Sequence, residues 1–388
     1  MNEKYIERET SGGKAYIKSA SLSKLREVDA IIFDCDGVLI DVRGSCDEAI
    51  RETVAQMFRR LTGISINRDF ISKEVIYLFR KSGDFNNDWS LTQTILLFLL
   101  GKLPTFFSET FMNNFDGEAL TFLSSIKEDI ENVNVARVIQ ELNKGLKDFA
   151  EKISESGLTL MENMIDLKPS EQLKKYLREL KALLRLGEVG ESTLVTFYEE
   201  IFCGSHLFKI IYGLEPRFYK GEGFLKEEKV VASFEKLDEI ASVIGGAKFG
   251  IASGRPFKLA EHTLGELLGK FVEGATIFLD EIEAESRRLR GKGLEVDLKK
   301  PNPFSLLKAS EALKPFRFLL YVGDSMEDAL AVERANQANP SFLFAGVYKY
   351  SSFEASLKQS FFDVEADLIL PSVNELPEVL SFIKESGK

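Results

Sequence analysis

The stretch Ile31-Ile32-Phe33-Asp34-Cys35-Asp36-Gly37-Val38-Leu39-Ile40-Asp41 joins a short apolar run to closely spaced carboxylates. The run is short, rich in β-branched residues and bounded by a turn residue, which predicts a buried strand of an α/β sheet. In open α/β sheets the chemistry lies at the carboxyl ends of the strands, so we expect Asp34 at such a position. Gly37 lets the chain turn sharply behind it. A polar exit from a strand, where Asp and Gly are common, is the alternative that this stretch alone leaves open.

Three later segments extend the pattern. They are Gly250-Ile251-Ala252-Ser253-Gly254-Arg255-Pro256, Lys300-Pro301-Asn302-Pro303 and Tyr321-Val322-Gly323-Asp324-Ser325-Met326-Glu327-Asp328. Together with the first stretch, and in this order, they resemble the four motifs of the haloacid dehalogenase-like hydrolase superfamily. The resemblance is to its phosphatase branch with a helical cap between motifs one and two (phosphoglycolate phosphatase and β-phosphoglucomutase-like proteins). It covers about the first tenth and the last third of the chain.

Four carboxylates of these segments point to a metal site. Asp34, Asp36, Asp324 and Asp328 are expected to converge at neighbouring strand ends, where like charges oppose each other's ionisation. A hard divalent cation resolves this conflict, and a set of oxygen ligands fits Mg²⁺. The two histidines and the three cysteines lack the spacing of metal ligands.

The chemistry of each residue type suggests its role. Asp34 is the candidate nucleophile that forms an aspartyl-phosphate, and Asp36 can protonate the leaving oxygen and later take a proton from water. Lys300 can neutralise charge on the transferring phosphoryl group, and the Ser253 hydroxyl can donate to one of its oxygens. The resemblance implies the same roles. It further implies that the Asp36 backbone carbonyl and the Asp324 carboxylate bind Mg²⁺, with Asp328 as a direct or water-mediated ligand.

Three of the motif residues have a structural alternative. Ser253 and Gly254, the latter a candidate substrate contact, could form the cap and turn before Pro256, and such a helix N-terminus also attracts anions. Asp328 could instead be an exposed acid in the first turn of a helix, where it would complement the helix dipole.

Basic residues near the motifs are open to more than one interpretation. Lys299 competes with Lys300 for the basic role, and the Pro-x-Pro that follows favours Lys300. Arg255 either touches substrate or braces Asp324. Arg43, close behind the first motif, is a candidate substrate contact or an ordinary solvated residue of a hinge.

Composition narrows the class of protein. The 388 residues are 44% hydrophobic and 29% charged, which is ordinary for a globular chain with two domains. A net charge of −11 argues against a nucleic-acid partner. The start lacks the apolar core of a signal peptide, and the most apolar run, Ile95–Leu100, is too short for a bilayer, so no membrane partner is expected. Cysteines without a disulfide pattern suggest a cytoplasmic location.

The order of elements predicts an α/β fold with a doubly wound, mainly parallel Rossmann-like core sheet and a large helical cap inserted after the first strand. Residues 1–28 are expected to be a polar leader or an edge element, 29–42 with 246–388 the catalytic core, and 43–245 the cap. Expected strands are Ala247–Ala252, Ala275–Leu279, Phe316–Val322, Ser341–Val347 and Leu368–Leu370. Expected cap helices are Ala49–Leu61, Gln93–Leu100, Val135–Ile153, Glu171–Leu186 and Val230–Ile244.

A cap over the site can exclude water and supply specificity. This one is about twice the size expected for its branch, which suggests a larger substrate, a homo-oligomer interface or a partner contact. Hinges are expected near Asp41–Ser45 and Ile244–Lys248, where Gly44, Gly245 and Gly246 suit the role. Tyr212–Gly223 is either a specificity loop or a surface connection.

The sequence therefore predicts a Mg²⁺-dependent phosphomonoester hydrolase that acts on a small phosphorylated metabolite. A phosphomutase of the β-phosphoglucomutase type is the first alternative, although Cys46 stands where that branch has a His. A haloacid dehalogenase is disfavoured because Asp36 supplies an acid that dehalogenases lack. A binding or regulatory protein that lost activity is the alternative from another class, and the complete set of motif residues argues against it.

Overall fold

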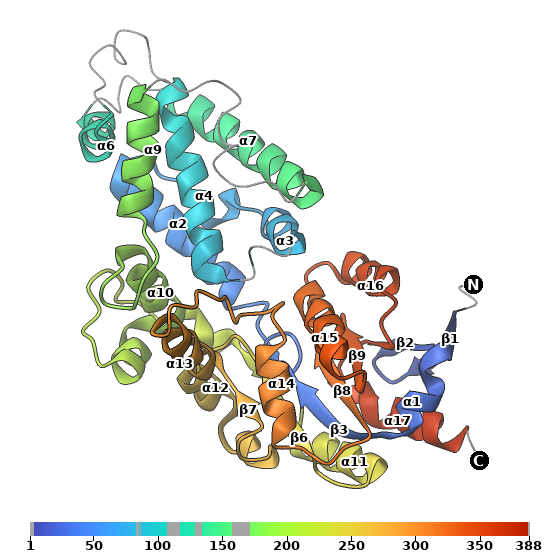
Figure 1. Ribbon diagram of the computed structural model, residues 1–388. Helices are drawn as coiled ribbons and strands as arrows, with labels where there is room; N and C mark the ends of the chain where they lie inside the picture. The colour runs from blue at the N-terminus through green and yellow to red at the C-terminus, as the bar shows by residue number, and fades with distance from the viewer. Residues whose placement is uncertain are drawn as a thin grey trace. The chain divides into compact units, whose positions relative to one another are not determined.

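The computed structural model describes residues 4–82, 85, 87–106, 117–128, 134–156 and 171–386 (Figure 1). The chain forms two compact units, and each is described by itself. The core unit consists of Met1–Arg43 and Glu228–Lys388, and the helical unit is Gly44–Glu227. Residues 228–245, which the sequence analysis assigned to the cap, thus fall in the core unit. The cap assignment of 43–245 stays a prediction.

The core unit is built on an eight-stranded sheet in the order β1-β2-β10-β9-β8-β3-β6-β7. The six strands from β10 to β7 run parallel, and a hairpin of β1 and β2 adds two antiparallel strands beside β10. This confirms the predicted mainly parallel α/β fold, and it makes part of residues 1–28 an edge element. The strands are β1 Tyr5–Thr10, β2 Gly13–Lys18, β3 Val28–Phe33, β6 Phe249–Ala252, β7 Thr276–Ile277, β8 Phe318–Gly323, β9 Phe342–Val347 and β10 Leu368–Leu370.

Helices cover both faces of this sheet (Figure 1). Along β3, Ile31 and Phe33 enter an apolar cluster on one face, while Ala30 and Ile32 enter a second cluster on the other. A strand buried on both faces reads as a continuous apolar run, which explains the pattern that precedes Asp34. The helices are α1 Leu22–Arg26, α11 Phe234–Ile244, α12 Phe257–Leu264, α13 Leu279–Arg290, α14 Phe304–Glu311, α15 Met326–Ala338, α16 Glu354–Asp363 and α17 Leu376–Glu385.

One expected strand of the core and one expected helix of the cap differ in detail. The expected strand Ala275–Leu279 is shorter, because β7 covers only Thr276–Ile277 and α13 starts at Leu279. The expected helix Val230–Ile244 starts later, at Phe234, where the Ser233 side chain accepts a hydrogen bond from the Lys236 amide. Before it, Lys229–Val230 forms β5, which pairs with β4, Ile40–Asp41.

The helical unit packs around α4, Asp88–Lys102, where every residue from Leu91 to Leu100 except Gln93 is buried. Since a helix that is apolar all round belongs in a core, this position follows from its composition. The N-terminus of α4 is capped by Asn87. Against it pack α2 Cys46–Thr62, α7 Val135–Ser156, α9 Glu171–Leu183 and α10 Thr193–Tyr212, while α3 Lys73–Lys81 contacts α7 and α6 Ala119–Glu128 contacts α2 and α9. Within the described ranges, no helix combines the length and the apolar character that a membrane crossing requires.

Candidate active site

Asp34 lies directly after β3, between β8 and β6. Its amide donates to the Val322 carbonyl at 2.9 Å, which extends the pairing of β3 with β8 as far as the carboxylate. The residue is 8% exposed, and its Oδ1 accepts the Cys35 amide at 2.7 Å. The turn that follows is closed by the Ile40 amide on the Cys35 carbonyl at 2.9 Å. The carboxylate is therefore held at the carboxyl end of a central strand.

Lys300 carries the positive charge nearest to Asp34. Its Nζ lies 2.7 Å from Asp34 Oδ2 and 2.8 Å from Asp328 Oδ1. These two carboxylates raise the pKa of Lys300 well above its ordinary value against the opposing effect of burial, so the ammonium stays charged. Lys299 lies beside it in the chain, and its amide donates to Asp297. The choice of Lys300 over Lys299 therefore agrees with the geometry.

Asp328 is completely buried, so it is not the exposed first-turn acid considered as an alternative. Its Oδ2 accepts from the Ser325 hydroxyl and from the amides of Asp324 and Ser325, forming a capping box at the start of α15. Its Oδ1 accepts from Lys300 and from the Tyr321 hydroxyl at 3.0 Å. Asp328 thus fixes the lysine and the helix N-terminus together.

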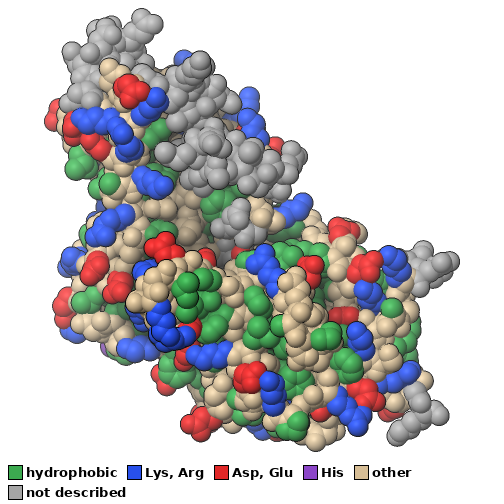
Figure 2. Space-filling model, in the orientation of Figure 1, with side chains coloured by type: hydrophobic (Ala, Val, Ile, Leu, Met, Phe, Trp, Pro, Cys, Tyr) green, Lys and Arg blue, Asp and Glu red, His purple; other side chains and the backbone are tan. Residues whose placement is uncertain are grey.

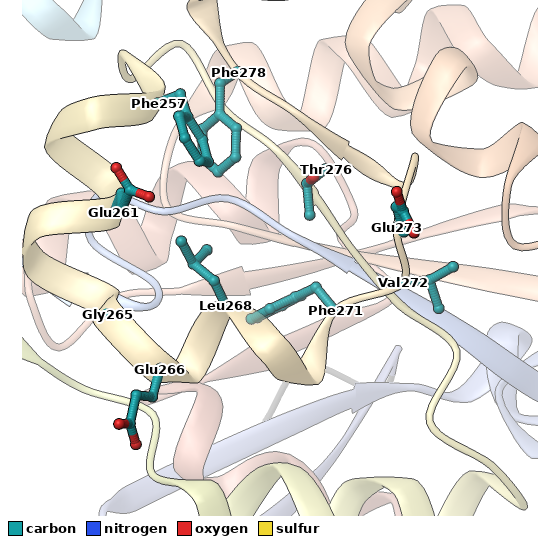
Figure 3. Close-up of a pocket in the computed structure, with 10 residues that line it drawn as sticks. All are labelled: Phe257, Glu261, Gly265, Glu266, Leu268, Phe271, Val272, Glu273, Thr276 and Phe278. Carbon is teal, nitrogen blue, oxygen red and sulfur yellow. The ribbon is translucent and has the colours of Figure 1, made fainter.

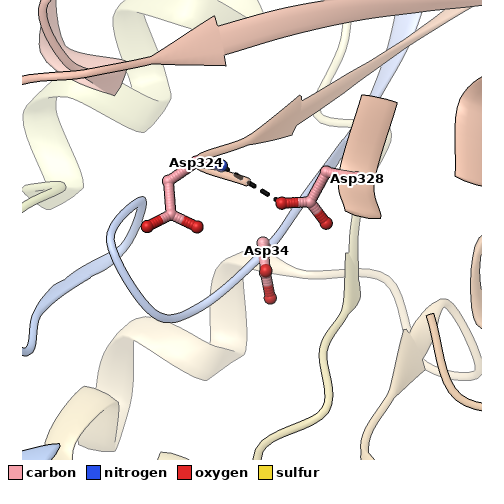
Figure 4. A group of neighbouring side chains, drawn as sticks. All are labelled: Asp34, Asp324 and Asp328. Atoms are coloured by element: carbon pink, nitrogen blue, oxygen red, sulfur yellow. Dashed lines mark hydrogen bonds between the residues drawn. The ribbon is translucent and has the colours of Figure 1, made fainter. Parts of the chain in front are cut away.

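Asp34, Asp324 and Asp328 form one acidic cluster (Figure 4). Each offers a carboxylate oxygen, and these oxygens lie within 4.8 Å of one another. Burial, opposed by Lys300, raises the pKa of Asp34 to about 6, and burial with the neighbouring acids raises the pKa of Asp324 well above its ordinary value. Such a set could hold a metal ion, because a cation offsets the repulsion, and its oxygen-only donors suit a hard cation.

Gly37 makes room for the Asp324 carboxylate. It has φ +73°, and a Cβ built on it would lie only 1.9 Å from Asp324 Oδ2. A residue with a side chain could not keep both the turn and this close approach. The cluster therefore depends on the glycine of the first motif as well as on its acids.

Asp36 is not part of this cluster, and its carboxylate pairs with Arg255. Arg255 Nη1 donates to Asp36 Oδ1 at 2.6 Å, and Nη2 donates to Glu228 Oε2 at 2.5 Å. The expected bracing by Arg255 thus involves Asp36, where the sequence analysis had named Asp324. Glu228 was not singled out from the sequence, since a lone glutamate beside other charged residues carries no motif.

The remaining residues of the second motif differ in their surroundings. Ser253 is 1% exposed, its amide donates to the Ile277 carbonyl, and its Oγ accepts the Arg255 amide at 3.3 Å. It is not the cap of α12, whose N-cap residue is Pro256. Gly254 is exposed, with open space where a Cβ would stand. Their roles toward a substrate stay predictions.

Arg43 is engaged within the core unit. Its guanidinium donates to both Asp41 oxygens, at 2.9 and 2.8 Å, and its carbon lies 5.1 Å from the centre of the Tyr350 ring. It also donates to the Lys349 carbonyl at 3.4 Å. These contacts brace the segment that follows β4, and a substrate contact by Arg43 stays a prediction.

The stretch Tyr212–Gly223 in the helical unit is fixed by a buried carboxylate. Glu200, which is fully buried in α10, accepts the amides of Arg217, Phe218 and Tyr219 at 2.6 to 2.8 Å. The stretch folds back on the kink of α10 at Gly204, where a Cβ would meet the Gly223 backbone. It is therefore an internally anchored loop, and its role in specificity stays a prediction.

A pocket of about 640 Å³ lies at the β7 edge of the core unit, apart from the acidic cluster (Figure 3). Phe257, Leu268, Phe271 and Phe278 are among its apolar lining residues, and glutamates contribute its polar part. None of the motif aspartates lines it. The pocket therefore adds nothing to the chemistry of Asp34.

Comparisons with known proteins give two structural likenesses. No family model matches the chain, and neither does any curated protein sequence. The X-ray structure of Northeast Structural Genomics Consortium target ZR25 aligns with a TM-score of 0.56 at 19% identity, covering 92% of this chain and 100% of the other. Phosphatase Tt82 from Thermococcus thioreducens aligns with a TM-score of 0.46 at 20% identity, covering 86% and 98%. The first likeness supports the fold alone.

Proposed function

We propose that this chain is a Mg²⁺-dependent phosphomonoester hydrolase of the haloacid dehalogenase-like superfamily. It would act on a small phosphorylated metabolite through an aspartyl-phosphate on Asp34. One observation carries the proposal. A buried carboxylate at the end of a central parallel strand has a lysine 2.7 Å from one oxygen and two further carboxylates beside it. This is the arrangement that transfer of an anionic phosphoryl group to a carboxylate requires.

The chain's own residues would carry the reaction in two steps. In the first, an Asp34 oxygen bonds to phosphorus while the bond from phosphorus to the leaving oxygen breaks, and Asp36 gives its proton to that oxygen. In the second, Asp36 takes a proton from water, the water oxygen bonds to phosphorus, and the bond to Asp34 breaks. Lys300 neutralises charge near Asp34 throughout, and Asp328 holds Lys300 in place.

Asp34 and Asp324, with the Asp36 carbonyl, would hold the metal ion. Asp328 already accepts five hydrogen bonds, so its contribution would be to orient the residues around the site. When bound, Mg²⁺ supplies positive charge that offsets both the carboxylates and the transferring phosphoryl group. Buried carboxylates with upward-shifted pKa values support this assignment.

The test is phosphate release from a panel of phosphorylated metabolites, with Mg²⁺ and with excess chelator. Wild type should release phosphate only with Mg²⁺, and Asp34→Asn should be inactive although its circular dichroism and melting are unchanged. Asp148→Asn, which changes an exposed aspartate in α7, serves as the control and should keep wild-type activity. Turnover by Asp34→Asn near the wild-type rate, or full activity in chelator, would contradict the proposal.

A further inference from the structure

Arg255 is a buried cation whose charge is matched from two sides. Its side chain is 2% exposed, and a guanidinium in such a place requires carboxylate partners. One partner is Asp36, whose side chain is 39% exposed, and the other is Glu228, whose side chain is 1% exposed. The planar guanidinium presents separate nitrogens to the two acids, which a lysine could not do. Arg255 is therefore a bridge between them.

Glu228 is rigidly placed. Besides Arg255, its Oε2 accepts the Thr263 hydroxyl of α12 at 2.8 Å. Arg255 itself is tied to the start of α13, because its carbonyl accepts the Leu279 amide at 3.0 Å. Glu228 is thus the anchored partner of Arg255, and the half-exposed Asp36 is the partner whose position Arg255 restrains.

Both connecting segments of the chain meet at this bridge. Asp36 precedes β4, on the segment that leaves the core unit, and Glu228 precedes β5, on the segment that returns after Glu227. The two segments pair, with Ile40 opposite Val230, and the Val231 amide donates to the Leu39 carbonyl at 2.8 Å. A single arginine therefore joins the acid–base candidate to the returning segment.

We propose that Glu228 and Arg255 are positioning residues for Asp36. Glu228 holds the guanidinium, and the guanidinium fixes the orientation in which the Asp36 carboxyl exchanges a proton with the leaving oxygen. The placement of Asp36 then depends on the backbone of the segment that returns from the insertion. This inference rests on the proposed function for its catalytic consequence, whereas the bridge itself can be tested without turnover.

The bridge is tested by amide hydrogen exchange on the full chain without substrate. Glu228→Gln keeps the shape of the side chain but removes its charge. A hydrogen bond to a charged group changes the equilibrium constant for local opening by about tenfold to a hundredfold. We therefore expect the amides of residues 37–40 and 231 to exchange faster in this variant by about that factor. Thr263→Val, which keeps all charges, should give a smaller loss in the same peptides. Glu227→Gln, at the exposed neighbour, is the control. Unchanged exchange in Glu228→Gln would overturn the proposal.

The catalytic consequence is tested with two substrates of different leaving group. β-Glycerophosphate needs a proton on its leaving alkoxide, whereas the phenolate of p-nitrophenyl phosphate leaves without one. Because displacing a catalytic group by about 1 Å costs on the order of a hundredfold, Glu228→Gln should lower kcat/KM for β-glycerophosphate by about tenfold to a hundredfold. For p-nitrophenyl phosphate the loss of kcat/KM should stay within about threefold, because its phenolate leaving group needs little general acid catalysis.

Three outcomes separate the possibilities. An equal loss with both substrates would mean a general structural defect and would overturn the positioning role. In an Asp36→Asn background, Glu228→Gln should have no further effect, because residues that act as a unit are not additive. If wild type hydrolyses neither substrate nor any compound of the panel, the proposed function fails, while hydrogen exchange still decides whether the bridge holds Asp36.

Discussion

Replacing Gly37 by alanine should disable the acidic cluster by a steric route that leaves every charge in place. The new Cβ would stand 1.9 Å from Asp324 Oδ2 and 2.9 Å from Asp324 Cβ. Rotation of the Asp324 side chain cannot relieve the contact between the new alanine Cβ and Asp324 Cβ, because this rotation does not move the Cβ atom. The turn or the Asp324 backbone must therefore move by roughly 1 Å to restore van der Waals separation.

The magnitude separates into backbone strain and displacement. A non-glycine residue in the left-handed region costs about 1–2 kcal/mol, and Gly37 has φ +73°. Gly293, in the turn after α13, has φ +78° and open space around its would-be Cβ, so Gly293→Ala shows the strain alone. In a domain of about 200 residues each kcal/mol lowers Tm by about 2–4 °C. Displacement of Asp324 by about 1 Å should add a loss of activity on the order of a hundredfold.

The assay is phosphate release as a function of Mg²⁺ concentration, with thermal melting of the same samples. Gly37→Ala should lose about a hundredfold in kcat/KM and require more Mg²⁺ for half-maximal rate. Gly293→Ala should melt a few degrees lower, as the strain predicts, and keep its activity. The reasoning is refuted if Gly37→Ala shows wild-type turnover and Mg²⁺ dependence, or if both variants lose activity alike.

Two further predictions concern buried charges. Burial raises the pKa of Glu199 to about 7 from its ordinary 4.5, so its favourable contribution to folding is complete below pH 4.5 and is lost as the pH rises to about 7. Glu199→Gln should remove a pH-dependent loss of folding stability of roughly 3 kcal/mol. Trp89, the single tryptophan, donates to Glu199 at 2.7 Å, so the variant should also lose a titration of its fluorescence near pH 7. Lys300→Met should lower kcat/KM by about a hundredfold or more and lower Tm without Mg²⁺, because it leaves buried carboxylates unpaired. Lys299→Met should do neither.

Unchanged pH dependence of melting in Glu199→Gln would mean that this carboxyl is charged in the folded chain at neutral pH. Equal effects of Lys300→Met and Lys299→Met would mean that Lys300 is not the specific basic partner of Asp34.

The sequence predicted the sheet because its evidence is local. Each central strand is a short apolar run, and each motif follows such a run, so the positions of Asp34, Ser253 and Asp324 follow from the order of strands. Helix α10 was missed because it is apolar on most sides and is broken by the kink at Gly204, so no continuous helical pattern runs along it. Helix α13 was missed for the opposite reason, since only Leu279 and Ile282 of its side chains are buried.

The contacts within the site were less accessible from sequence. Spacing placed Asp328 near Asp34, but its burial depends on Lys300, from a separate segment of the chain, as well as on Tyr321 of its own segment. The bridge from Asp36 through Arg255 to Glu228 joins residues that no local pattern connects. Such partners are set by tertiary packing, which a single sequence does not record.

The N-terminal hairpin has a consequence for solubility. Without it, β10 would be the edge of the sheet, and its three residues Leu368–Leu370 are apolar and fully buried. An apolar edge strand invites pairing between copies and open-ended aggregation. β1 presents Glu7, Arg8 and Glu9 instead. Two copies could pair through β1 as antiparallel strands related by a twofold axis normal to the sheet. When that axis passes through one of these charged residues, the residue lies opposite the same residue of the other copy. Like charges opposed across two strands repel each other. The hairpin thus replaces an apolar, aggregation-prone edge strand with a charged edge strand that disfavours pairing with a second copy of the chain.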